Sequence, residues 1–128
     1  MTDTPQSGTP QSGLTDNAAG AISYLTFIPA IIFLAIPPYN AKPFVRFHAW
    51  QSIFLSIAAF VVGIAVAIFV GITAAFLPWG LYGLVHMIGP LIDLLWLILW
   101  LVCVMKAING GKFVIPIIGP LAEQMANK

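Results

Sequence analysis

Long apolar stretches alternate with short polar segments along the chain. The apolar stretches cover residues 18–36, 47–77 and 81–105. With a rise of 1.5 Å per residue, a helix over residues 18–36 measures about 28 Å, close to the roughly 30 Å hydrocarbon core of a bilayer. The two later stretches are long enough to cross as well. The pattern therefore predicts an all-α integral membrane protein with three transmembrane helices.

Proline and glycine mark the ends of the predicted helices. Pro37 and Pro38 end the first span, and the turn at residues 77–80 contains both Pro78 and Gly80. Because this turn is short, the second and third spans are predicted to form a long hairpin. The third span is expected to end at Lys106, before the glycines of residues 110–111.

The chain is divided into three parts on this basis. Residues 1–16 are polar and rich in Pro, Gly, Ser and Gln, so they are predicted to be a disordered tail. Residues 17–121 form the three-span membrane domain, and residues 122–128 form a short cytoplasmic tail. The apolar residues 113–119 are too short and too rich in proline to cross a bilayer. They are predicted to be a C-terminal segment at the membrane interface.

Composition narrows the classes of function. Hydrophobic residues make up 60% of the sequence and charged residues only 7%, which leaves too little polar surface for a water-soluble globule of this size. The net charge is +1, so no basic patch for nucleic acid is expected. The sequence contains no standard catalytic motif and a single cysteine. We therefore expect a protein that is not an enzyme, has no cofactor and contacts membrane lipids.

The basic residues predict the orientation of the spans. In a three-span arrangement they all fall on one side of the membrane: Lys42, Arg46, Lys106, Lys112 and Lys128. The positive-inside rule makes that side cytoplasmic. The C-terminus is therefore expected in the cytoplasm and the N-terminus outside.

Asp93 is the only acidic residue within a predicted span. An unpaired carboxylate at that depth costs at least about 2.5–3.5 kcal/mol, so Asp93 is expected to be protonated, partnered or in contact with water. His86 lies two helical turns earlier on the same face, and Pro90 between them predicts a kink. The pair fits either a polar clamp between helices or a proton or ion relay.

Small residues recur at every fourth position of the second span. Such a ridge allows another helix backbone to approach closely. It could face the third span opposite Asp93, or it could join two copies of the protein. The ridge consists of Ala59, Gly63, Ala67, Gly71 and Ala75.

A polar and aromatic motif stands at the cytoplasmic start of the second span. Its members suit either an anchor in the headgroup layer or a contact surface for the apolar residues 113–119, which otherwise face water. The motif comprises Arg46, Phe47, His48, Gln51 and Ser52.

This motif also carries a resemblance. Together with residues 17–25 and 111–119, the run Phe44-Val45-Arg46-Phe47-His48-Ala49-Trp50-Gln51-Ser52 resembles a bacterial family of small membrane proteins of unknown function. That family is similar to the Tic-type membrane subunit of the chloroplast inner-envelope import machinery. The resemblance implies a location in the bacterial cytoplasmic membrane and a distant link to protein translocation or complex assembly.

Two functions follow as hypotheses. The preferred one is a non-enzymatic scaffold, assembly or translocation-related protein that works as a homo-oligomer or as a subunit of a larger membrane complex. The alternative is a component of a proton- or ion-coupled transporter or channel that uses Asp93 and His86.

Overall fold

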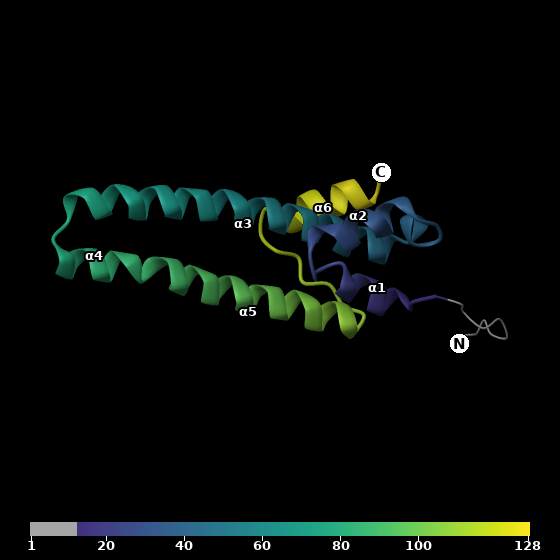
Figure 1. Ribbon diagram of the computed structural model, residues 1–128. Helices are drawn as coiled ribbons and strands as arrows, with labels where there is room; N and C mark the ends of the chain where they lie inside the picture. Colours follow the sequence, from purple (N-terminus) through teal and green to yellow (C-terminus); the bar gives the residue numbers. More distant parts are fainter. Residues whose placement is uncertain (1–12) are drawn as a thin grey trace.

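The computed structural model describes residues 13–128, which form helices joined by short turns (Figure 1). Two long arms run side by side, and the short helices gather at the end of the arms that lies away from their connecting turn. The elements are α1 (Asp16–Ile22), α2 (Phe27–Ala35), the 3-10 turn η1 (Tyr39–Ala41), α3 (Pro43–Phe76), α4 (Trp79–His86), α5 (Ile88–Ile108) and α6 (Ile118–Ala126).

The two arms confirm the predicted hairpin. One arm is α3, which has 34 residues, and the other is the 30-residue stretch Trp79–Ile108. Both are long and apolar enough to cross a membrane. The first arm begins at Pro43, earlier than predicted, because proline is well suited to the first position of a helix.

The second arm is interrupted once. The helix α4 ends at His86 and α5 begins at Ile88. Pro90 lies in the first turn of α5 and has no N–H to donate to the carbonyl of His86, so the helix cannot continue unbroken through this point. The interruption lies next to Pro90, where the sequence predicted a kink.

The first predicted span is absent from the structure, and this part of the prediction is corrected. Residues 18–36 form two short helices of 7 and 9 residues in place of one long one. Pro29 explains the break, because it cannot donate to the carbonyl of Leu25 and its ring would collide with that carbonyl in a continuous helix. The Thr26 hydroxyl instead accepts a hydrogen bond from the N–H of Ile28 and caps a new helix.

The start of α1 lies at the same end of the molecule as the C-terminal segment. The Nζ atom of Lys42 is 2.6 Å from Oδ1 of Asp16, and Nδ2 of Asn17 donates to the carbonyl of Ile108 over 3.1 Å. An N-terminus on the opposite side from the C-terminus required the first span, so that expectation loses its basis. The predicted disordered tail falls mainly on residues 1–12, which lie outside the described residues.

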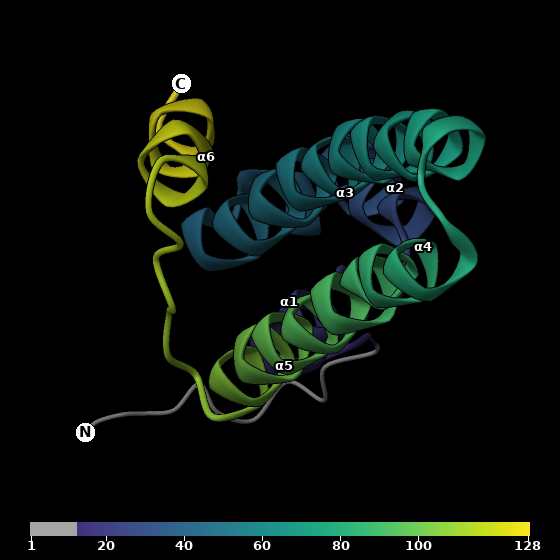
Figure 2. The ribbon, with the colours of Figure 1, turned by 90° about the vertical axis from the view of Figure 1, so that its left-hand side faces the viewer.

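We call the packed end of the molecule the base. It consists of residues 16–55, which include α1, α2, η1 and the start of α3, and of residues 96–128. The rest of the two arms, residues 56–76 and 79–95, we call the distal arms. All buried side chains of the described chain belong to the base, and none of residues 56–102 is buried. Figure 2 shows the chain between α5 and α6 passing from one arm to the other.

Candidate functional site

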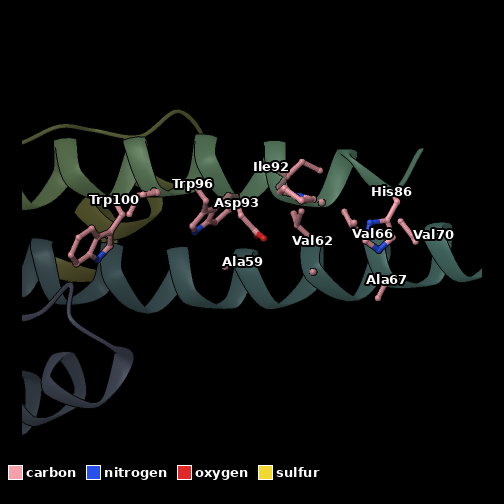
Figure 3. Close-up of a pocket in the computed structure, with 14 residues that line it drawn as sticks. Ala59, Val62, Val66, Ala67, Val70, His86, Ile92, Asp93, Trp96 and Trp100 are labelled. Atoms are coloured by element: carbon pink, nitrogen blue, oxygen red, sulfur yellow. The ribbon is translucent and has the colours of Figure 1, made fainter. Parts of the chain in front are cut away.

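A groove separates the two arms. It encloses about 570 Å³ between α3 on one side and α4 and α5 on the other (Figure 3). Most of its lining is aliphatic, and its polar members come from the second arm. The lining includes Ala59, Gly63, Ala67, His86, Asp93 and Trp96.

Asp93 and His86 both face this groove. The Asp93 carboxylate points from α5 toward α3 near Ala59, and His86 lies farther along the groove beside Val70 (Figure 3). Both side chains are exposed in the single chain. No hydrogen bond or ion pair joins Asp93 to any residue that the structure describes. A polar clamp that closes the arms on each other is therefore not present within one copy.

The small-residue ridge opens onto the groove and leaves the arms apart. Ala59, Gly63 and Ala67 line the groove, whereas Gly71 and Ala75 lie beyond it. A Cβ atom added at Gly63 or Gly71 would meet nothing within 4 Å. The close approach that such a ridge permits is thus unused in the single chain.

The base contains a buried chain of hydrogen bonds that starts at Tyr24. Its hydroxyl lies 2.8 Å from Nδ1 of His48, and Nε2 of His48 lies 3.2 Å from the carbonyl of Gly111. A carbonyl only accepts, so His48 donates from Nε2 and accepts from Tyr24 at Nδ1. Burial raises the pKa of Tyr24, which keeps the hydroxyl protonated for this role.

Gln51 extends this network to the C-terminal segment. Its Nε2 donates to the Tyr24 hydroxyl oxygen over 2.8 Å and to the carbonyl of Phe113 over 2.9 Å. Its Oε1 accepts from the N–H of Ile115 over 3.3 Å. The predicted contact between this face of the second helix and residues 113–119 is therefore confirmed. The amide group of the Gln51 side chain thus bonds to the backbone of this segment on both its donor and its acceptor side.

Arg46 fixes the last helix. Its guanidinium donates to the carbonyls of Met125 and Ala126 over 3.0 and 2.9 Å, and to the carbonyl of Asn40 over 3.1 Å. The first two carbonyls end α6, where a positive charge is favourable. The motif around Arg46 is mostly internal, since Phe47 is 0% and Ser52 is 3% exposed.

Sequence reasoning missed two contributors to the base. The sequence pattern placed Tyr24 within the first membrane span and gave Trp100 no role in the base. In the structure, Nε1 of Trp100 donates to the carbonyl of Tyr24 over 2.5 Å, which holds the turn between α1 and α2 against the second arm. The signal available in the sequence was Ser23, Tyr24 and Thr26 followed by Pro29, an unusual run for the middle of a span.

The family assignment comes from comparison with known proteins. Residues 15–122 match the magnetosome magnetite crystal formation protein family, MamF/MmsF. The chain belongs to this family. The match contains the whole base network, from Tyr24 to Ile115, and both distal arms.

Curated relatives of this MamF/MmsF-family chain are archaeal membrane proteins. A UPF0132 membrane protein of Methanocaldococcus jannaschii is 39% identical over 112 residues, which cover 88% of this chain and 89% of the relative. A UPF0132 membrane protein of Archaeoglobus fulgidus is 34% identical over 112 residues, covering 87% and 95%. No solved structure matches the chain.

These findings correct the resemblance drawn from the sequence motif. The residues that suggested a Tic-type family belong to a MamF/MmsF-family chain, so the link to chloroplast import is wrong. The motif misled because its residues hold the base together, a structural task that does not identify a transport function. The archaeal relatives also give no support to a bacterial source.

Proposed function

We propose that the protein is a non-enzymatic membrane scaffold that works as an assembly of identical copies joined through the groove between the distal arms. The observation that carries this proposal is the exposed carboxyl group of Asp93 in a groove lined by small residues. In lipid, an unpartnered carboxylate costs at least about 2.5–3.5 kcal/mol. A second copy relieves this cost and fills the open ridge.

In a symmetric dimer, residues of the two copies that lie at the same depth in the membrane contact each other. In a two-fold dimer with its axis along the membrane normal, Asp93 of one copy meets the groove of the other near Ala59 and Gly63. The small side chains allow the backbones to approach closely. A protonated carboxyl group can then donate a hydrogen bond across the interface, which is worth about 1–2 kcal/mol between membrane helices.

We infer that both described ends of the chain lie in the cytoplasm. The five basic residues all lie in the base, and the positive-inside rule places that end on the cytoplasmic side. Only the distal arms then cross the membrane.

Disulfide crosslinking between copies tests the assembly. A cysteine replacing Ala67 in the groove should crosslink two copies in native membranes under mild oxidation. The matched control is Ile68→Cys, one residue away at the same depth but outside the groove. Both variants carry Cys103→Ala, so that no other thiol reacts. Equal crosslinking at positions 67 and 68 would contradict the proposed interface.

A proton or ion pathway is the second candidate, because His86 and Asp93 line the same groove. Such a pathway requires water along the groove. A cysteine at position 93 should then react with a charged, water-soluble thiol reagent, whereas the scaffold function predicts an inert thiol. Ile68→Cys, again without Cys103, supplies the unreactive lipid-facing reference.

A further inference from the structure

The molecule has very different widths at its two ends. Two helices form the distal arms, whereas α1, α2 and α6 add to the same two arms in the base (Figure 1). With side chains, each helix is about 10 Å across. The base is therefore roughly twice as wide as the distal arms.

The added width lies on one side of the bilayer. The 34 residues of α3 measure about 51 Å, but residues 56–76 alone cover about 30 Å, the thickness of the hydrocarbon core. When the distal arms cross the core, residues 43–55 extend beyond it on one side. The helices packed around those residues then occupy the boundary layer of that leaflet only.

The exposed surface of α2 is apolar and is suited to contact with lipid. Its inner face packs through Phe33 against Ala19 and Val45. Its outer face is also apolar and about half exposed, at residues Phe27, Ile28, Ile31, Ile32 and Ile36. The helix has no polar residue, so its exposed side has to be covered by acyl chains where it packs beside the start of α3. The exposed basic residues Lys106 and Lys128 of the base suit anionic headgroups in the same leaflet.

We propose that the base acts as a wedge in one leaflet, so that the protein concentrates where the membrane is convex on the side of the base. Inserting extra helices at the headgroup level of one leaflet spreads its lipids and leaves the other leaflet unchanged. Convex curvature opens the space that the wedge needs. The partner of the α2 surface is thus a curved lipid leaflet.

Sorting into membrane tubes tests this inference. The full chain, labelled with a dye at an Asn127→Cys substitution with Cys103→Ala, is placed at low density in giant vesicles of phosphatidylcholine and phosphatidylglycerol. A quencher that cannot cross the membrane separates copies with the base outside from copies with the base inside. Narrow tubes are then pulled from the vesicles. Copies with the base outside should be enriched about twofold or more in the tube, and copies with the base inside should be depleted.

Two matched sets of alanine substitutions show which helix causes the enrichment in the tubes. Alanine at Phe27, Ile28 and Ile31 keeps α2 helical and shrinks the wedge, so the enrichment should fall. Alanine at Phe60, Ile64 and Ile68, exposed positions of the distal arms, should leave it unchanged. Equal densities in tube and vesicle for both orientations of the parent protein would overturn the wedge. Low density keeps this result independent of assembly through the groove.

Discussion

The base and the distal arms differ in what covers the side chains of α3. In the base, α3 is surrounded by short helices, and its polar side chains Arg46, His48 and Gln51 all bond to other parts of the chain. In the distal arms, α3 has no cover within the chain, and large apolar residues such as Phe60 and Ile68 are more than half exposed. The base takes its stability from internal contacts, and the distal arms depend on lipid.

Because of this difference, substitutions in the two regions are expected to change different properties of the protein. A change in the base alters the folding of the single chain, because buried groups such as His48 and Gln51 have specific partners there. A change in the distal arms leaves the single chain intact and alters what surrounds it. Unfolding in detergent micelles measures the first property, and crosslinking in membranes measures the second.

Gln51→Ala should have the largest effect on unfolding. It removes the hydrogen bonds of Gln51 to Tyr24, Phe113 and Ile115 and leaves the carbonyl of Phe113 and the N–H of Ile115 without partners inside the base. Each unsatisfied buried group costs about 1–3 kcal/mol, so a loss of about 3–5 kcal/mol in unfolding free energy is expected. The control is Gln124→Ala, at an exposed position of α6. A loss no greater than that of the control would show that the network does not stabilise the base.

One glycine from each region allows a direct comparison. A Cβ atom at Gly119 would lie 2.9 Å from the backbone Cα and C atoms of Val114, whereas a Cβ atom at Gly63 has open space around it. Gly119→Ala should destabilise the chain by about 1–3 kcal/mol, and Gly63→Ala should change unfolding by less than about 0.5 kcal/mol. Denaturant titration of both variants checks this, and equal effects would remove the distinction between base and arm.

Arg46→Lys should release the end of α6 with a smaller cost. Lysine keeps the charge but cannot reach the carbonyls of Asn40, Met125 and Ala126 together. The expected loss is about 1–2 kcal/mol, with faster amide hydrogen exchange confined to α6. Lys128→Arg serves as the control, because it exchanges the same two residue types at a side chain that donates to none of these carbonyls. Uniformly faster exchange across the whole base would argue against a local capping role.

Asp16→Asn should have the smallest effect. The Lys42 and Asp16 side chains form an ion pair, but they are 28% and 45% exposed. Water and salt weaken such pairs, so a change of about 0.5 kcal/mol or less is expected, and added salt should reduce it further. A double-mutant cycle with Lys42→Gln isolates the pair, and a coupling of several kcal/mol would place this ion pair among the main stabilising contacts.

The sequence predicted the distal arms well and the base only in part. Continuous apolar composition and the turn at Pro78 are local signals, and they were enough to define the hairpin. The bond from Trp100 to Tyr24 joins residues that are 76 positions apart, and no local pattern reports it. Pro29 was a local signal against the first span, but the apolar length of residues 18–36 concealed it.

The groove was also predicted only in part from the sequence. Counting residues from the hairpin turn predicted that Asp93 faces Gly63 and Ala67, but the structure places it near Ala59, about one helical turn farther from the hairpin turn (Figure 3). The distance between the arms could not be predicted, because small residues permit close contact without requiring it. Only the three-dimensional structure shows that Gly63 faces open space.

The path of the last residues has a consequence for synthesis on the ribosome. Besides the Tyr24 hydroxyl, the partners of His48 and Gln51 are backbone groups of Gly111, Phe113 and Ile115, which are among the last to be made. The chain grows from its N-terminus, so the hairpin can enter the bilayer before these backbone partners leave the ribosome. Until then Tyr24 is the only one of these partners that has been made. A nascent chain cut short before residue 111 would therefore leave the network of the base incomplete.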